Sequence, residues 1–360
     1  MEDLQMSEGF TVKSSIKDYK VHFSSSLAAD LKKIVQPGDY IIIDESVFAL
    51  NKELQSDLEG QDKLIKIKAS ESTKSYEGVI PFIEVLIANG FKRNNRLIAI
   101  GGGIIQDVTA FMASILYRGV QWIFFPTTLL AQADSCIGSK TSINFRNYKN
   151  QIGNFYPPYS VHIDPTILVT LEERDIRSGI GEMAHYFFVS GTEDVEFFKR
   201  EYQEALIHRS NLQKVIEASL AIKKRYIEVD EFDLNERIVF NYGHTFGHAI
   251  ESVTNYEIPH GVAVSFGMDM ANFISMKKGY ISMEDFLQAQ QVFRTIREGY
   301  SIQDISTEDL LAAMAKDKKN ENGNIGLILT KGWGRMFRDL TKPDNTLISW
   351  MNEYLKNNKN

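Results

Sequence analysis

Residues 1–166 alternate short β-branched runs with longer segments of helical spacing, and this alternation limits the possible folds strongly. The runs at 39–47, 64–70, 96–103 and 121–126 are typical of buried strands, while 75–90 and 104–116 have the spacing of helices. Strands that alternate with helices favour a parallel sheet with right-handed crossovers. We therefore predict a doubly wound α/β domain over residues 1–166.

The strand predicted at 96–103 runs into three glycines, Gly101 to Gly103, directly before a helix. Glycine lets the backbone approach a ligand closely, and a helix start offers free N–H groups to a pyrophosphate. The sequence is not GxGxxG, so an ordinary tight turn explains it equally well. Asp44, at the end of an earlier strand, is a candidate acceptor for ribose hydroxyls, because ligands bind beyond the carboxyl ends of parallel strands.

A polar stretch follows at 127–158, and we predict that it is a long functional loop. Its interleaved Ile, Phe and Tyr residues argue against disorder. Lys140 and Asn150 are candidates for holding an anion, although a lone lysine in a loop is more often simply solvated.

From residue 167 the pattern changes to successive helices, which predicts a second, helical domain at 167–360. In its first helix, at 171–189, Glu182 lies between Gly181 and Met183. A carboxylate with apolar neighbours is costly unless it is paired or bound to a cation. Glu182 is therefore a candidate metal ligand.

Three of the seven histidines fall within residues 241–260. His244 and His248 are four residues apart, which places both rings on one face of a helix. His260 follows a proline at a predicted loop-to-helix junction, from which it could fold back onto that face. A catalytic zinc takes three protein ligands and keeps one position open, so the cluster and Glu182 predict a metal site. The pattern is not HExxH, which argues against a zinc protease.

Composition excludes several classes of function. The 360 residues carry a net charge of −7 and no basic stripe, so we expect no nucleic-acid partner. The opening residues lack a signal segment, and no apolar run is long enough to span a bilayer. The single cysteine, Cys136, permits neither an intrachain disulfide nor a thiolate metal cluster. We expect a soluble, cytoplasmic protein that does not bind membranes.

Six motifs in order resemble the 3-dehydroquinate synthase and sugar phosphate cyclase family: GGGIIQD, YRG, PTTLLAQADSCIGSKTSIN, KNQIGNFYPP, NYGHTFGHAIE and DKK. The resemblance implies an N-terminal NAD-binding α/β domain, a C-terminal helical domain, and an active site in the cleft between them. Members of this family are commonly dimers, so the resemblance also implies a homodimer.

The resemblance assigns roles that spacing alone leaves open. It implies metal ligation by Glu182, His244 and His260, usually to zinc, with cobalt or iron also acceptable to this donor set. His248 would face the substrate instead of the metal. The other implied substrate residues are Arg118, Asp134, Lys140, Asn150, Lys223, Arg237, Asn241, Lys318 and Lys319. The implied NAD-binding residues are Asp44, Glu71, Lys74, Gly102, Gly103, Asp107, Thr127 and Thr128.

The implied reaction is that of a lyase in the shikimate pathway of aromatic amino acid biosynthesis. It converts 3-deoxy-D-arabino-heptulosonate 7-phosphate to 3-dehydroquinate and phosphate, with transient oxidation by NAD. Arg237 would grip the substrate carboxylate through two parallel hydrogen bonds.

The sequence departs from the family pattern at three places. His185 stands where the family usually has lysine, Gln106 replaces a usual glycine in the phosphate-binding turn, and Ser139 replaces a glycine before Lys140. His185 keeps open a related cyclase acting on sedoheptulose 7-phosphate or glucose 6-phosphate. A metal-dependent polyol or glycerol phosphate dehydrogenase and a binding protein without catalysis are further alternatives. Arg237 and Asn241 favour the carboxylate-bearing substrate.

Overall fold

The computed structural model describes residues 9–146, 148–315 and 320–358. The chain forms two compact units, Met1–Leu171 with Ile227–Phe232, and Glu172–Tyr226 with Asp233–Asn360. We predicted a division after residue 166. The first unit instead continues to Leu171 and includes one short segment that follows much later in the sequence.

The first unit is built on a seven-stranded sheet with the order β1-β2-β9-β6-β5-β3-β4. Every neighbouring pair is parallel except β1 and β2, so the predicted parallel α/β sheet is confirmed. Its strands are β1 (Phe10–Val12), β2 (Tyr19–Phe23), β3 (Tyr40–Asp44), β4 (Leu64–Ile67), β5 (Leu97–Gly101), β6 (Trp122–Pro126) and β9 (Ser160–Ile163). We had not predicted β1, β2 and β9, which are short and interrupted by polar residues such as Lys20 and His162.

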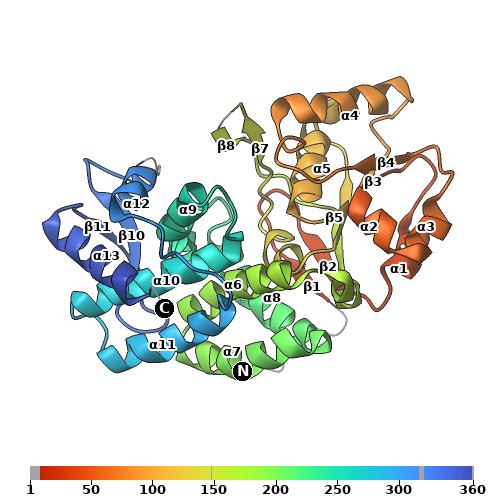
Figure 1. Ribbon diagram of the computed structural model, residues 1–360. Helices are drawn as coiled ribbons and strands as arrows, with labels where there is room; N and C mark the ends of the chain where they lie inside the picture. The colour runs from red at the N-terminus through yellow and green to blue at the C-terminus, as the bar shows by residue number, and fades with distance from the viewer. Residues whose placement is uncertain (1–8, 147, 316–319, 359–360) are drawn as a thin grey trace. The chain divides into compact units, whose positions relative to one another are not determined.

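Helices cover both faces of this sheet (Figure 1). They are α1 (Leu27–Ile34), α2 (Glu45–Leu50), α3 (Lys52–Leu58), α4 (Tyr76–Ala88) and α5 (Gly103–Ile115). One apolar cluster joins Leu31 of α1 and Leu54 of α3 to Ile41 and Ile43 of β3. The intervening Ile42 points to the opposite face, because successive strand residues alternate. Buried Ile residues on both faces explain why β3 reads as a continuous apolar run.

The order of the strands places a switch point between β3 and β5. From β3 the chain moves outward to β4, and then returns to β5 on the other side of β3 before continuing to β6. Open parallel sheets bind ligands at such a point, beyond the carboxyl ends of the strands. Here those ends are Asp44 and Gly101.

The prediction of a long loop at 127–158 was wrong. This segment contains a π-helical turn at Ala131–Ser135 and a hairpin of β7 (Ile143–Phe145) and β8 (Tyr148–Ile152). Buried Ile143 anchors the hairpin, whereas β8 is largely exposed and therefore polar. A solvent-facing strand carries no apolar run, and for this reason its sequence resembled a loop.

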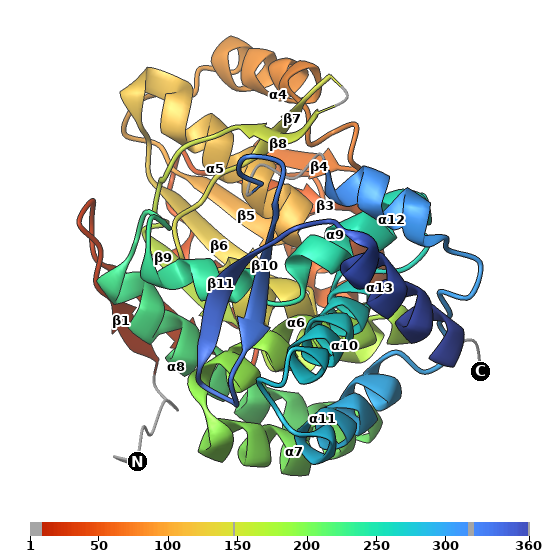
Figure 2. The same cartoon turned by 90° about the vertical axis from the view of Figure 1, so that its left-hand side faces the viewer.

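The second unit is mainly helical, as predicted (Figure 2). Its helices are α6 (Glu173–Ser190), α7 (Thr192–Ile207), α8 (Leu212–Val229, whose last residues belong to the first unit), α9 (His244–Val253), α10 (His260–Lys277), α11 (Met283–Ile296), α12 (Thr307–Met314) and α13 (Asn345–Asn357). A hairpin of β10 (Ile325–Thr330) and β11 (Met336–Thr341) completes it. Short 3-10 turns lie at Leu116–Arg118, Pro165–Thr170, Arg209–Asn211 and Glu236–Asn241 across the chain.

Helix α10 is the centre of this unit and is buried on all sides from Gly261 to Ser275. Glycines let its neighbours approach closely. A Cβ on Gly261 would lie 1.8 Å from the carbonyl oxygen of Ser178 on α6, and one on Gly267 would lie 2.0 Å from that of Gly243, before α9. These backbone contacts bring α6 and α9 against α10.

None of the helices in the described residues has the length and apolar character needed to span a membrane.

Candidate metal centre and nucleotide site

Three helices of the second unit bring the predicted metal ligands together. Glu182 projects from α6, His244 begins α9 and His260 begins α10. The ligand atoms of these three residues all lie within 4.8 Å of one another. His244 Nε2 is 3.5 Å from Glu182 Oε1, and His260 Nε2 is 3.3 Å from Glu182 Oε2. The contact of Gly261 with α6 therefore places a ligand on α10 beside the ligand on α6.

The other nitrogen of each ring fixes the tautomer. His244 Nδ1 lies 3.2 Å from the carbonyl oxygen of Tyr242, and His260 Nδ1 lies 3.0 Å from Glu251 Oε2. Both partners accept, so both rings donate from Nδ1 and turn the lone pair of Nε2 toward Glu182. Within the described residues, buried Glu182 Oε2 has no hydrogen-bond partner apart from its ion-pair contact with His260 Nε2.

This arrangement fits a cation. Two imidazole lone pairs and a buried carboxylate that face one another are unfavourable unless a positive charge lies among them. One carboxylate and two imidazoles are also a common donor set of a catalytic zinc, with one position left for substrate. The residues thus match both the charge and the ligand chemistry of the expected metal.

The protonation of the cluster shows the same need for positive charge. Burial raises the pKa of the Glu182 carboxyl, but the nearby imidazoles of His244 and His185 and the hydrogen bonds to Glu182 outweigh it and hold that pKa well below its usual range. Burial lowers the pKa of His260, yet Glu182 and Glu251 outweigh it and raise that pKa well above its usual value. In the absence of a metal, a proton on His260 compensates the carboxylates.

His248 and His185 lie around this centre. The ring of His248 is 5.5 Å from that of His244 and 5.6 Å from that of His260, and His248 is exposed. A second donor group of His248, Glu251 and His260 shares one imidazole with the first. His185 is buried, with Nδ1 3.6 Å from Glu182 Oε1. The unusual histidine therefore lies directly beside the predicted metal ligand.

The sequence argument missed Glu251 and Tyr242 as partners of the ligands. Glu251 lies outside the His244/His248 pair, so the HExxH pattern gives it no role. Its actual partner, His260, follows across a loop between helices. No spacing rule predicts that contact.

The predicted NAD residues surround the switch point of the first unit. Gly102 caps α5 without a side-chain hydrogen bond, and a Cβ on Gly103 would meet only open space. Asp44 ends β3 and accepts a hydrogen bond from the Ser46 N–H at 2.8 Å. Buried Thr127 Oγ1 has no hydrogen-bond partner among the described residues. An uncapped helix start, open space beside it and an orphaned hydroxyl fit the phosphates and hydroxyls of a dinucleotide.

The remaining NAD candidates contact one another or their neighbours. Lys74 Nζ lies 2.6 Å from Asp107 Oδ2. Burial raises the pKa of Asp107, although Lys74 and the Ser142 N–H oppose this. Glu71 accepts a hydrogen bond from Asn144 at 2.8 Å, and Thr128 Oγ1 accepts one from the Ala131 N–H at 3.2 Å.

Of two departures from the family pattern, the structure explains Gln106 but not Ser139. Gln106 donates to the Ser135 carbonyl oxygen at 2.6 Å and accepts from the Ser135 hydroxyl at 2.5 Å, which ties α5 to the π-helical turn. Ser139 has a φ of 61°, in the left-handed region that glycine adopts without strain. A glycine would adopt this backbone conformation with less strain than serine does.

The predicted substrate residues fall in both units. Arg118, Asp134, Lys140 and Asn150 belong to the first, and Lys223, Arg237, Asn241 and His248 belong to the second. Lys223 is buried on α8, with Nζ 5.9 Å from the Tyr186 ring centroid. Arg237, also buried, and Asn241 share the 3-10 turn Glu236–Asn241. Lys318 and Lys319 lie outside the described residues.

Comparison with known proteins covers both units. Residues 64–178 match the family described as 3-dehydroquinate synthase N-terminal, and residues 179–320 match 3-dehydroquinate synthase C-terminal. A 3-dehydroquinate synthase of Alkaliphilus metalliredigens is 35% identical over 344 residues, which covers 94% of this chain and 96% of that one.

Solved structures share the fold. The 2-epi-5-epi-valiolone synthase of Streptomyces hygroscopicus, with NAD+ and Zn2+ bound, is 25% identical with a TM-score of 0.84, covering 96% of this chain and 99% of that chain. A 2-deoxy-scyllo-inosose synthase complexed with carbaglucose-6-phosphate, NAD+ and Co2+ is 22% identical with a TM-score of 0.84, covering 97% of this chain and 100% of that chain. With both family models matched and a relative this similar over nearly its full length, the chain belongs to the 3-dehydroquinate synthase family.

Proposed function

We propose that this protein is a 3-dehydroquinate synthase, which converts 3-deoxy-D-arabino-heptulosonate 7-phosphate to 3-dehydroquinate and phosphate with NAD and a divalent metal, usually zinc. The convergence of Glu182, His244 and His260 carries the proposal, because the family's chemistry depends on such a centre. The full-length similarity to a curated 3-dehydroquinate synthase favours this substrate over those of the other cyclases.

The metal, when bound, would stabilise a substrate alkoxide as a Lewis acid, and NAD would supply the capacity to take up and return a hydride. Glu182, His244 and His260 would hold the metal. Gly102, Gly103 and Thr127 would bind the dinucleotide, with Asp44 on a ribose. Oxidation makes the neighbouring C–H acidic, after which phosphate can leave.

The polar residues of the chain would position the substrate. Buried Arg237 would grip the carboxylate with its planar fork, and Asn241 would hydrogen-bond a hydroxyl from the same turn. Lys140 and Asn150 would hold the phosphate, with the remaining predicted substrate residues around them. Fixed positioning of this kind lowers the barrier without any covalent contribution from the protein.

A phosphate-release assay tests the proposal. We expect the purified protein with NAD and zinc or cobalt to release phosphate from the heptulosonate phosphate without net accumulation of NADH. Glu182→Ala serves as the control. Faster release from sedoheptulose 7-phosphate or glucose 6-phosphate would instead assign the protein to another cyclase activity, and accumulating NADH would assign it to the dehydrogenases.

A homodimer is part of the proposal. Helix α4 exposes apolar side chains that a monomer would leave in water: Ile80 is 39%, Val85 42% and Ile87 56% exposed. Tyr76 of α4 lies edge-on to Phe145 of the β7–β8 hairpin, whose Tyr148 is 67% exposed. Exposed apolar side chains of this kind favour an interface, and a second copy of the chain is the partner that the family implies.

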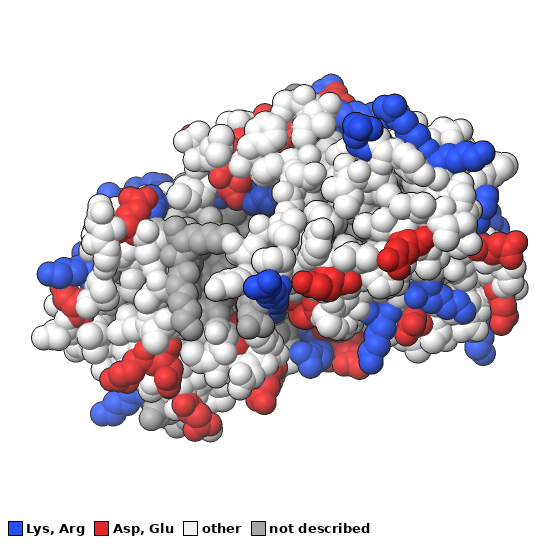
Figure 3. Space-filling view, turned by 90° about the horizontal axis from the view of Figure 1, so that it is seen from above, with Lys and Arg blue, Asp and Glu red and all other residues white. Residues whose placement is uncertain are grey.

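The expected ligands are small molecules. On the face seen in Figure 3, acidic and basic side chains are interspersed, without the single-sign field that a nucleic acid or an anionic membrane requires. A cytoplasmic location also remains a proposal, and it agrees with a lone, buried Cys136.

A further inference from the structure

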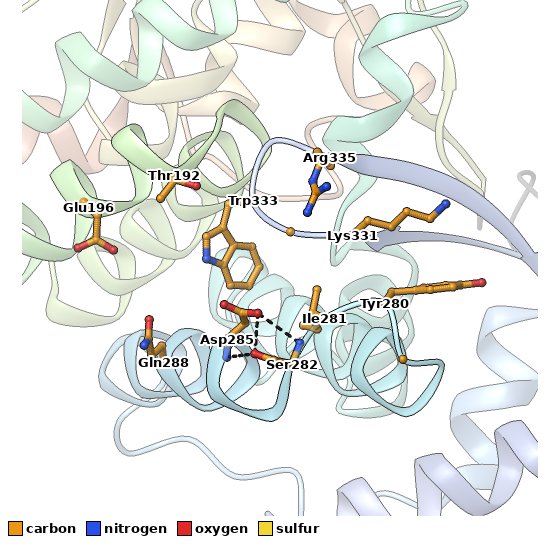
Figure 4. Close-up of a pocket in the computed structure, with 12 residues that line it drawn as sticks. Thr192, Glu196, Tyr280, Ile281, Ser282, Asp285, Gln288, Lys331, Trp333 and Arg335 are labelled. Carbon is orange, nitrogen blue, oxygen red and sulfur yellow. Dashed lines mark hydrogen bonds between the residues drawn. The ribbon is translucent and has the colours of Figure 1, made fainter.

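The second unit contains a pocket of about 720 Å³ that none of the predicted site residues lines. It lies between the turn of the β10–β11 hairpin, the first residues of α7, and the segment that leads from α10 into α11 (Figure 4). Its lining includes Thr192, Glu196, Tyr280, Lys331, Trp333 and Arg335.

This pocket is far from the metal ligands. Helix α10 begins at His260, a ligand, and ends at Lys277, two residues before the pocket lining starts at Gly279. At a rise of 1.5 Å per residue, such a helix separates its two ends by about 27 Å. A molecule in the pocket would therefore not touch the catalytic centre.

An aromatic surface is held rigidly in the pocket. Trp333 projects into it from the hairpin turn (Figure 4). Its indole packs edge-on against Phe188 with ring centroids 4.8 Å apart, and the next N–H, that of Gly334, donates to the Phe188 carbonyl oxygen at 3.0 Å. The indole is only partly buried by these contacts, so one part of it remains available for a planar ligand.

Two cations line the pocket: Arg335 lies on the side of the indole, whereas the side chain of Lys331 extends away from Trp333 toward Tyr280 (Figure 4). Lys331 and Arg335 are exposed, and within the described residues neither has a carboxylate at ion-pair distance. Lys331 Nζ is held over aromatic rings, 4.9 Å from the Phe337 centroid and 5.6 Å from that of Tyr280. The short turn between them is closed by the Arg335 N–H, which donates to the Gly332 carbonyl oxygen at 2.9 Å.

The acidic residues of the pocket are already engaged. Glu196 pairs with Lys199 at 2.8 Å, outside the lining. Asp285 Oδ2 accepts from the hydroxyl and the N–H of Ser282, at 2.7 and 3.2 Å, in the capping box that starts α11. Within the described residues, neither carboxylate of the lining therefore forms an ion pair with Lys331 or Arg335.

From these observations we propose that the pocket binds a small aromatic anion. Its ring stacks on Trp333, and its carboxylate or phosphate pairs with Arg335, while Lys331 adds a second positive charge to the lining. Arginine suits either group because its planar fork donates two parallel hydrogen bonds. Stacking and charge pairing act on the same ligand only if it carries both features, which distinguishes this class from simple anions.

Calorimetry with four probes tests the proposal: phenyl phosphate, benzoate, inorganic phosphate and benzyl alcohol. We expect one of the two aromatic anions to bind at least tenfold more tightly than both inorganic phosphate and benzyl alcohol, and the better of the two identifies the anionic group. Binding should also change the fluorescence of Trp333, and Trp333→Leu should remove that change.

Paired variants locate the binding. The double variant Lys331→Met/Arg335→Gln should bind the preferred aromatic anion at least tenfold more weakly than the wild type does. The charge-matched control Arg294→Gln/Lys342→Met, at exposed positions outside the pocket, should bind normally. Equal affinity in the wild type and the pocket variant, equal loss in the control, or no aromatic anion bound above inorganic phosphate would each overturn the proposal.

Discussion

His260 uses its two ring nitrogens toward two different carboxylates: Nδ1 lies 3.0 Å from Glu251, and Nε2 lies 3.3 Å from Glu182. The first contact orients the ring, and the second faces the predicted metal position. A carboxylate behind a ligating histidine fixes its tautomer and raises its basicity.

We therefore expect Glu251→Ala to weaken zinc binding by about 10- to 100-fold, with a smaller loss for Glu251→Gln, whose amide oxygen still accepts a hydrogen bond. Competition with a chromophoric chelator measures the affinity directly, without an activity assay. The exposed Glu257→Ala is the matched control. Unchanged zinc affinity in Glu251→Ala would show that the contact does not position the ligand.

The close approach of α6 and α10 predicts a steric effect. In Gly261→Ala the new methyl group would meet the Ser178 carbonyl oxygen at 1.8 Å, so the helices must separate. We expect a loss of stability of about 3 kcal/mol, together with weaker metal binding, because Glu182 and His260 move apart. Urea unfolding measures the first effect. Gly103→Ala, where a Cβ meets open space, should unfold at the same or a higher urea concentration. Wild-type stability in Gly261→Ala would contradict the packing argument.

His162 predicts a pH dependence of stability. Burial, and secondarily the charge of His22, lowers the pKa of His162 from 6.5 to about 4. The unfolded chain thus binds a proton at a pH where the folded protein does not. The contribution of His162 to the free energy of unfolding is fully present above pH 6.5. It is lost as the pH falls from 6.5 to 4, by up to about 3 kcal/mol.

The variant His162→Phe keeps a ring between His22 and Phe125 and removes the titration. Its free energy of unfolding should depend less on pH across that range than the wild type's. His208→Phe, at an exposed position, is the control. Parallel pH profiles of His162→Phe and the wild type would refute the assignment.

A substitution of Thr127 should affect NAD binding without lowering the stability of the protein. The Thr127 hydroxyl is buried without a partner in the described part of the chain, so Thr127→Val should leave the stability of the free protein unchanged or slightly raise it. If that hydroxyl contacts NAD, the same variant should weaken NAD binding by about 1 kcal/mol, roughly fivefold. Thermal unfolding and calorimetry measure the two quantities. Normal NAD affinity in Thr127→Val would remove this residue from the nucleotide site.

Arg237 tests the choice of substrate. If Arg237 binds a carboxylate, Arg237→Ala should lower kcat/KM on the heptulosonate phosphate. The expected loss of transition-state stabilisation is about 2–5 kcal/mol. Because Arg237 is buried, the melting temperature of the variant must be compared with that of the wild type. A folded variant with an unchanged specificity constant would show that the carboxylate binds elsewhere.

The sequence determined the class of fold and the candidates for the metal ligands. Apolar runs alternating with helical segments predicted the parallel sheet, since a strand buried on both faces must be continuously apolar, as residues 40–43 are. The position of His260 at a helix start was also predicted, because a proline precedes it. The apolar neighbours of Glu182 indicated a ligand, and the packing of the helices brings it to His244 and His260.

Only the tertiary structure decided which groups meet across elements. The contact of Glu251 with His260 spans a loop, and the indole of Trp333 packs on Phe188 from a hairpin far along the chain. Local periodicity describes which face of one element is apolar, but the partner of that face depends on how helices pack. Here backbone contacts at Gly261 and Gly267 set that packing. A pattern along the chain cannot encode distances that arise only when separate helices come together.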